Sequence, residues 1–265
     1  MRPLQDMKDD RGIPLDRVGV SGLAAMVSYD TADGPETATA DMDLSVTLPG
    51  EARGVHLSRF SRVLADTDVH VSPNGIRPLL EQLVAELGVT TAYVEISYDQ
   101  PIAKTAPVSG LAATMTCAVR FSASLDTTES ADAGRTPRLR CSLAVALPVM
   151  TVCPCSQEAT DGIGHSQRTH VEMAVAYDGC FLASELVELA ESCASAPVHP
   201  LLTGEDERAI LESAVLRPVF VEDLVRSVAE RLEADVRVRW YRVEAESLES
   251  VSAHNVYAAV ERTIS

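Results

Sequence analysis

The sequence lacks any stretch of apolar residues long enough to cross a bilayer. It has 265 residues, of which 46% are apolar. No run in it approaches the roughly eighteen uninterrupted apolar residues that a membrane-spanning helix needs. The first residues, MRPLQDMKDDRGIP, also lack the apolar segment of a secretory signal. We therefore expect a soluble, cytoplasmic protein with no membrane partner.

Basic residues are scarce as well. The 22 Lys and Arg residues stand against 39 Asp and Glu, which gives a formal net charge of -17. This balance argues against nucleic acid as a partner. A small anionic substrate remains possible, because a binding site needs only a few local cations. The phosphate-binding patterns G-x-x-x-x-G-K-[ST] and G-x-G-x-x-G are both absent, which excludes the standard nucleotide loops.

The chain also lacks the cysteine density of a disulfide-stapled protein. Its six cysteines are scattered over a full-sized domain, and cytosolic thiols stay reduced. Cys117 and Cys141 lie inside apolar, strand-like runs and are expected to be buried. No second close-spaced Cys/His pair follows at zinc-ribbon spacing, so a structural zinc ribbon is disfavoured.

The order of elements predicts an α+β protein. Each half of the chain reads strand, strand, helix, helix, strand, strand, and antiparallel strand pairs with helices on one face make an α+β architecture. One half-buried strand is predicted by alternating apolar residues: Met42, Leu44, Val46 and Leu48. We predict an N-terminal tail at 1–16, an N-terminal module at 17–126, a linker at 127–137 and a C-terminal module at 138–265.

The segment 148–171, PVMTVCPCSQEATDGIGHSQRTHV, carries the strongest chemical signal. In extended backbone Cys153 and Cys155 would project to the same side, so both sulfurs could face one site. Two buried cysteines at a strand end are an equally plausible alternative from the spacing alone. His165 follows two glycines that let the loop fold back. One Cys, one His and one carboxylate, with a fourth position for water, are typical of a catalytic metal site.

Other candidates are weaker when taken one by one. His56 and Arg59 in GVHLSRF, and Lys104 in AKTAPVSG, could contact an anion, as could Arg168. Solvated charges are the ordinary interpretation of Asp206, Glu207 and Glu222, although Glu222 at a helix start also gains from the helix dipole. The default for His254 is a position at the edge of the core.

Taken together, the motifs resemble the prokaryotic type IB GTP cyclohydrolases. This metal-dependent family opens the guanine ring of GTP to give dihydroneopterin triphosphate, the first step of pterin and folate biosynthesis. The resemblance covers nearly the whole chain, in these stretches: IPLDRVGV, GVHLSRF, KTAPVSG, PVMTVCPCSQE, GHSQRTHVEM, PVHPLL, FVEDLVRSVAERL, and VEAESLES followed by His254.

The resemblance implies a tunnelling fold (T-fold) built from two tandem ββααββ modules. It also implies a homo-oligomer, a tetramer with active sites at subunit interfaces, and GTP as the substrate. One divalent metal (Zn, Mn or Fe) would be held by Cys153, His165 and Glu207. Cysteine, histidine and carboxylate suit all three of these metals.

The same resemblance assigns roles to the remaining candidates. Cys155 and His254 become proton-transfer residues beside the metal ligand Cys153. Glu222 would hold the purine edge, because a carboxylate accepts two hydrogen bonds from the N–H groups of guanine. The other substrate contacts, partly from neighbouring subunits, would be made by Arg59, Lys104, His56 and Arg168.

The chain departs from the family pattern at two positions, and three alternative functions stay open. The family usually reads His-Asn-Gln-Arg where this chain has Ser166 after His165, and it commonly has His-x-His where this chain has Ser252 two residues before His254. The alternatives are an archaeal-type relative that forms a cyclic phosphate product, and a T-fold metalloprotein that binds a purine or pterin without catalysis. A third is a redox protein that uses Cys153 and Cys155.

Overall fold

The computed structural model describes residue 5 and residues 7–128 and 137–264. Most of the predicted linker, and residues 1–4 and 6 of the predicted tail, lie outside the described residues. The first half contains β1 (Leu15–Thr31), β2 (Gly34–Leu48), α1 (Leu57–Ala65), β3 (Val69–Val71), α2 (Pro73–Leu87), β4 (Thr91–Thr105) and β5 (Ala112–Asp126). The second half contains β6 (Arg138–Val152), α4 (Pro154–Ala159), β7 (Ser166–Tyr177), α5 (Ala183–Cys193), β8 (Ala196–Pro197), α6 (Gly204–Val215), α7 (Val221–Ala234), β9 (Val238–Ser247) and β10 (Val256–Thr263).

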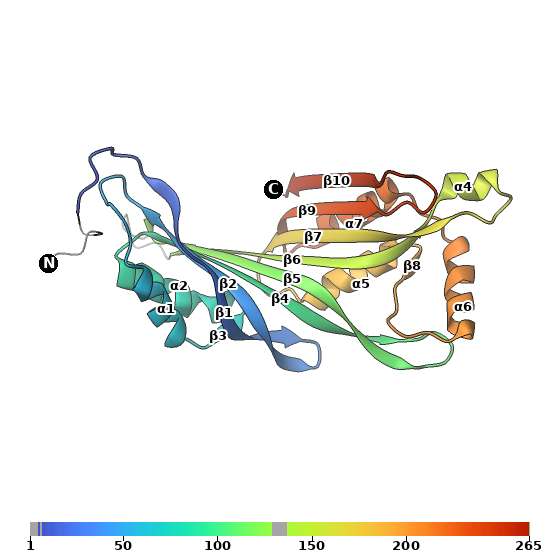
Figure 1. Cartoon of the computed structure of the whole chain (residues 1–265), viewed down its shortest axis with the longest axis horizontal. Coiled ribbons are helices and arrows are strands. Elements are labelled where there is room, and N and C mark those ends of the chain that lie inside the picture. The colour runs from blue at the N-terminus through green and yellow to red at the C-terminus, as the bar shows by residue number, and fades with distance from the viewer. Residues whose placement is uncertain (1–4, 6, 129–136, 265) are drawn as a thin grey trace. The chain divides into compact units, whose positions relative to one another are not determined.

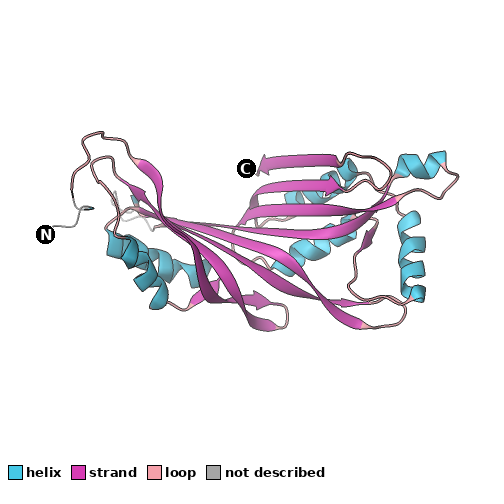
Figure 2. Ribbon diagram, in the orientation of Figure 1, coloured by secondary structure: helices cyan, strands magenta, loops and turns pink. Residues whose placement is uncertain are grey.

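The order ββααββ recurs in both halves, as predicted, and the α+β class is confirmed. Within the described residues, the additions to this order are the short strands β3 and β8 and the helices α4 and α6. The strands hydrogen-bond in the order β10-β9-β7-β6-β5-β4-β2-β1-β3, with β8 paired to β6 (Figures 1 and 2). Neighbours such as β1 and β2, or β7 and β9, are antiparallel, whereas β1 and β3 are parallel.

The chain divides into two compact units. Unit 1 comprises the residues up to Tyr98 together with Arg120–Ser142, and unit 2 comprises Asp99–Val119 together with Leu143–Ser265. The long strands β4, β5 and β6 therefore contribute residues to both units.

Unit 1 has a core formed by strand faces and two helices. The alternation predicted for β2 is confirmed, because the four apolar side chains named above are all buried. Helices α1 and α2 pack against each other (Figure 1). Helix α2 begins at a Ser72 cap, whose side chain accepts from the Gly75 N–H, and it ends at Gly88 in the left-handed conformation. These are ordinary start and stop signals of a helix.

Unit 2 has its own core beneath β9. Helix α7 packs on β9 and β10 and against α5 (Figure 2). Its buried stripe comprises Val221, Leu224, Val225, Val228, Ala229 and Leu232. The helical spacing of the apolar residues in FVEDLVRSVAERLEA predicts one stripe, made of Phe220, Leu224, Val225, Val228 and Leu232. Phe220 is instead the residue that precedes the helix, and 37% of it is exposed. None of the helices in the described part of the chain combines the length and apolar character that crossing a bilayer requires.

Candidate active site

The connection between β6 and β7 brings Cys153 and His165 side by side. The backbone N–H of Cys153 donates to the carbonyl oxygen of His165 at 3.1 Å, which closes the loop where the two strands end. Gly164 makes this closure possible, because its φ is +58° and an added Cβ would lie 3.1 Å from a methyl group of Val152. A side chain is strained at such a φ, so glycine suits the turn. The loop therefore joins two of the three predicted metal ligands.

The His165 ring is held by its own neighbours. Its Nδ1 lies 2.6 Å from Oε1 of Gln167 and 3.9 Å from Oε2 of Glu249. The Gln167 amide nitrogen donates to Oε1 of Glu249 at 3.3 Å, and the Ser247 hydroxyl donates to the same oxygen at 2.9 Å. The His165 side chain is only 17% exposed. Its position is therefore fixed by side chains as well as by the backbone.

The two cysteines do not lie in extended backbone. Cys153 precedes the short helix α4, and Pro154 is the first helical residue, with Cys155 after it. The prediction that both sulfurs project to one side of an extended strand is therefore wrong. Proline at the first helical position is pre-organised for a helix, which explains the difference. Cys153 is half-buried and Cys155 is exposed, and both thiols are free.

The cysteines within the strands, Cys117 and Cys141, are more buried than Cys153 and Cys155. Burial raises the pKa of the Cys117 thiol to about 11 and that of Cys141 to about 12. Both were predicted to be small buried side chains, and both are buried. A thiol with a raised pKa is a poor nucleophile and metal ligand at neutral pH, because the reactive species is the thiolate.

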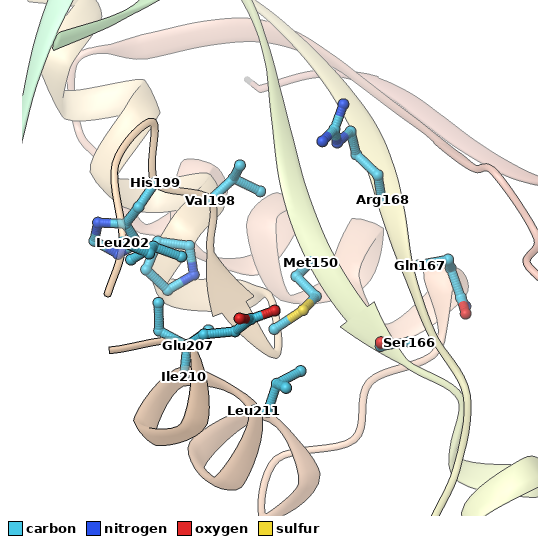
Figure 3. Close-up of a pocket in the computed structure, with 11 residues that line it drawn as sticks. Met150, Ser166, Gln167, Arg168, Val198, His199, Leu202, Glu207, Ile210 and Leu211 are labelled. Atoms are coloured by element: carbon cyan, nitrogen blue, oxygen red, sulfur yellow. The ribbon is translucent and has the colours of Figure 1, made fainter. Parts of the chain in front are cut away.

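Glu207 lies in the first turn of α6 and lines a cavity of about 370 Å³. Figure 3 shows its side chain extending from α6 toward Met150 of β6, with Arg168 on the strand β7. Ser166 and Gln167, the residues after His165, line the same cavity. The Glu207 carboxylate is exposed and accepts no hydrogen bond from the residues that the structure describes. It is available to bind a cation or a substrate donor.

Asp206, the residue before Glu207, has the opposite environment. It is 0% exposed, so the sequence-based interpretation of a solvated charge is wrong for this residue. Its carboxylate accepts from the Val108 and Ser109 N–H groups and the Ser109 hydroxyl at 2.6–2.9 Å. It also accepts from the N–H and hydroxyl of Thr203, at 2.9 and 2.6 Å. The turn between β4 and β5 is thereby fastened to the start of α6.

These bonds also set the charge of Asp206. Burial alone would raise the pKa of the Asp206 carboxyl. The hydrogen bonds from Ser109 and Thr203 outweigh burial and hold this pKa well below its usual range. Asp206 is therefore a buried, ionised residue with a structural role, next to the exposed Glu207 in the sequence.

The donor set fits a divalent cation. A thiolate, an imidazole and a carboxylate suit zinc, iron or manganese. Cys153 and His165 are adjacent, and Glu207 lines a cavity with the two residues that follow His165. Among the described residues, no three His, Cys, Asp or Glu side chains are already gathered as a metal site. The three residues therefore fit a cation by their donor chemistry and by lying in the same region of unit 2. The Glu207 carboxylate is not gathered with the other two donors in this structure.

The remaining predicted residues lie in several places. Glu222 is exposed in the first turn of α7 and lines a second cavity, of about 500 Å³, with Arg226 and Tyr241. Arg168 is exposed beside the first cavity, and His254 is exposed in the loop between β9 and β10. Within unit 2, the structure brings Arg168 and Glu207 to one cavity and places Glu222 at another.

Three of the predicted anion contacts do not line the cavity that Glu207 lines, and two of them have other partners in this structure. Lys104 is largely buried and forms an ion pair with Glu191. In unit 1, Arg59 donates to the carbonyl oxygen of Glu86, and His56 is the residue that precedes α1. Their predicted role in binding the triphosphate stays a prediction.

Sequence reasoning missed Gln167, Glu249 and His199. His199 lines the cavity with Glu207, and its buried Nδ1 has no hydrogen-bond partner within the described ranges. Burial, followed by the charge of Lys104, lowers the pKa of His199. A signal was available, because all three residues lie in motifs that carry the family resemblance: GHSQR, VEAESLES and PVHPLL.

The fold places the chain among the tunnelling-fold proteins. A highly active mutant of urate oxidase from Bacillus sp. TB-90 matches 94% of this chain and 100% of its own, with a TM-score of 0.59 and 8% identity. The uricase from Arthrobacter globiformis matches with a TM-score of 0.51 and 10% identity, over 94% of this chain and 93% of that one. At such low identity the likeness concerns the fold alone.

The sequence comparisons define the family. The model described as "Type I GTP cyclohydrolase folE2" matches residues 1–258. A protein named GTP cyclohydrolase FolE2 from Nitratidesulfovibrio vulgaris (Hildenborough) is 38% identical over 265 residues, covering 100% of this chain and 97% of the relative. The protein of the same name from Syntrophus aciditrophicus is 36% identical over 263 residues, covering 99% and 100%. The chain therefore belongs to the type I GTP cyclohydrolase folE2 family.

Proposed function

We propose that the chain is a type IB GTP cyclohydrolase that converts GTP and water to 7,8-dihydroneopterin triphosphate and formate. The observation that carries the proposal is the adjacency of Cys153 and His165 at the ends of β6 and β7, near a cavity lined by Glu207. Family membership over nearly the whole chain supports the same activity. Pterin and folate biosynthesis is the corresponding pathway.

We propose Cys153, His165 and Glu207 as the holders of one divalent cation. A cation held there supplies Lewis-acid chemistry that makes water nucleophilic near neutral pH. His165 offers Nε2 for this purpose, because Nδ1 already faces Gln167. All three of Cys153, Cys117 and Cys141 are free thiols, but Cys153 is half-buried whereas the other two are buried.

The substrate contacts follow from charge and exposure. Glu222 is exposed at the start of α7, where its two oxygens can accept from the guanine N–H groups. After water adds at C8 of the purine, ring opening and release of formate require proton transfers. Cys155 and His254 are the exposed candidates for these transfers. Arg59, His56, Lys104 and Arg168 are the proposed triphosphate and substrate contacts.

Oligomerisation belongs to the same proposal. We propose a homotetramer in which neighbouring subunits complete each site, on the strength of the family resemblance. Light scattering on the purified chain tests the tetramer, and a monomer with full activity contradicts it. The cytoplasmic location stays a prediction.

The activity is tested with chain stripped of metal by a chelator and reloaded with Zn²⁺, Mn²⁺ or Fe²⁺. GTP is supplied, and formate and the fluorescent oxidised pterin are measured. We expect turnover only after reloading, and loss of turnover in Cys153→Ala. Cys180→Ala is the matched control, because Cys180 is an exposed free cysteine outside the site. Full-rate turnover by chelated Cys153→Ala contradicts the proposal.

Product analysis separates the neighbouring functions. A linear triphosphate product supports the proposed reaction, whereas a cyclic phosphate product identifies the archaeal-type reaction. The departure at Ser252 favours testing a non-catalytic role as well. GTP binding without formate release, with every metal tried, identifies that role.

A further inference from the structure

Gln167 lies between a predicted metal ligand and a carboxylate. It is the second residue of β7 and only 9% exposed. Its amide oxygen is 2.6 Å from Nδ1 of His165, and its amide nitrogen is 3.3 Å from Oε1 of Glu249. A buried amide needs partners at both ends, because an unsatisfied polar group is costly to bury. Both ends of this amide have one.

The direction of the amide follows from Glu249. An ionised carboxylate can only accept hydrogen bonds, so the NH₂ group of Gln167 must face it. The Ser247 hydroxyl, at 2.9 Å, donates to the same carboxylate oxygen. The Gln167 carbonyl oxygen is then left facing His165, and it too can only accept.

The His165 tautomer follows in turn. Because the facing atom of Gln167 is an acceptor, Nδ1 of His165 must carry the hydrogen. In a neutral imidazole the other nitrogen, Nε2, then holds the lone pair. Glu249, 3.9 Å from Nδ1, favours the same arrangement, since its negative charge attracts the N–H dipole. His165 is thereby prepared to bind a cation through Nε2.

We propose that Gln167 is a positioning residue that fixes the tautomer and the ring orientation of His165 for cation binding. This role deepens the proposed function and rests on it for the identity of the site. Metal-binding histidines generally donate their second nitrogen to a fixed acceptor, and loss of that acceptor typically costs about 10–100-fold in metal affinity or activity. Here the acceptor for His165 is the neutral amide of Gln167. The carboxylate of Glu249 binds the other end of that amide.

The test compares Gln167→Leu with Gln157→Leu. Leucine removes the amide and keeps much of the side-chain bulk. Gln157 is the control because it is a half-buried glutamine whose amide donates to the backbone carbonyl of Val215 at 2.7 Å instead of contacting a candidate ligand. Circular dichroism and thermal unfolding establish that each variant is folded.

The first readout needs neither metal nor GTP. Histidine-labelled, metal-free chain is studied at about pH 8, where most imidazoles are neutral. Two-bond ¹H–¹⁵N correlations identify the protonated ring nitrogen, and His165→Asn assigns the signals of His165. We expect the Nδ1–H tautomer in wild type and in Gln157→Leu, and a mixture with Nε2–H in Gln167→Leu. A wild-type His165 protonated on Nε2 overturns the proposal, even if Gln167→Leu fails to fold.

The second readout is the affinity for Zn²⁺, measured by competition with a chromophoric chelator. Gln167→Leu is expected to bind about 10–100-fold more weakly than wild type, and Gln157→Leu within about threefold of it. Unchanged tautomer and unchanged affinity in a folded Gln167→Leu overturn the positioning role. The test of Gln167 can fail or succeed independently of the proposed cyclohydrolase activity. Wild type with the Nδ1–H tautomer and tight Zn²⁺ binding, but without formate release, refutes the cyclohydrolase and leaves the role of Gln167 standing.

Discussion

Two regions of unit 2 hold their functional side chains in different ways. At the start of α6, the buried Asp206 takes five hydrogen bonds and fixes the backbone, while the Glu207 carboxylate is left exposed. At the start of β7, the fold fixes the side chain itself, because Gln167 and Glu249 surround Nδ1 of His165. Of these two proposed ligands, His165 is held through its side chain, whereas Glu207 is held only through the backbone of its helix.

The difference has a consequence for cation binding. The backbones of Cys153 and His165 are already joined by a hydrogen bond, so these two proposed ligands start from neighbouring positions. In the proposed site, a change in the Glu207 side chain would complete the set, while the hydrogen bonds of Asp206 keep the start of α6 in place. Pre-organisation reduces the ordering cost of binding, and here it applies to two donors of three.

The largest expected effect is that of Glu207→Gln on turnover. We expect kcat/KM for GTP to fall by at least about 100-fold, since loss of a direct ligand should cost no less than loss of an outer partner. The melting temperature should stay close to that of wild type, because the exposed carboxylate has no hydrogen-bond partner in the described part of the chain. Steady-state kinetics and thermal unfolding measure the two quantities.

The control for this change is Glu205→Gln. Glu205 lies in the same first turn of α6 and is also exposed, but it does not line the cavity. It should keep nearly full activity. Equal kcat/KM values for Glu207→Gln and Glu205→Gln would contradict a role for Glu207 in the active site.

The next effect in size is that of Asp206→Asn on stability. Asparagine offers one oxygen instead of two and turns an NH₂ group toward donors from Ser109 and Thr203. We expect the melting temperature to fall by roughly 5–10 °C. Differential scanning calorimetry measures it, with Glu207→Gln as the neighbouring carboxylate control. An unchanged melting temperature means that the buried bonds do not fasten the turn to α6.

The smallest effect is the pH dependence of that difference. The pKa of Asp206 is lowered in the folded chain, so its stabilisation is present above the pKa of an unfolded aspartate, near about 3.9. The stabilisation is lost as the pH falls from there toward the folded-state pKa. The gap in melting temperature between wild type and Asp206→Asn should therefore be constant near neutral pH and should narrow below about pH 4. A gap that widens on acidification contradicts the assignment.

Local patterns in the sequence predicted much of the fold. Alternating apolar residues gave β2, and helical spacing gave the stripe of α7, because periodicity follows directly from backbone geometry. The helical start at Pro154 was missed, although proline at a first helical position signals one. Helix α6 was also missed, although Thr203 and Asp206 have the spacing of a capping box.

The site was predictable only in part. The resemblance singled out Cys153 and His165, which the structure places together. It gave no role to Asp206, whose bonds to Ser109 join residues 97 positions apart in the sequence. Such pairings depend on tertiary proximity, which no local pattern encodes. The hydrogen bonds that link His165 through Gln167 to Glu249 could not be predicted for the same reason, since Gln167 and Glu249 are 82 positions apart.

The most direct test of the cation site is anomalous diffraction from crystals of the chain grown with Mn²⁺, measured at the manganese edge. The account predicts one peak per subunit, bonded to the sulfur of Cys153, Nε2 of His165 and the carboxylate of Glu207. A peak bonded through Nδ1 of His165, or one that lies away from these three residues, contradicts it.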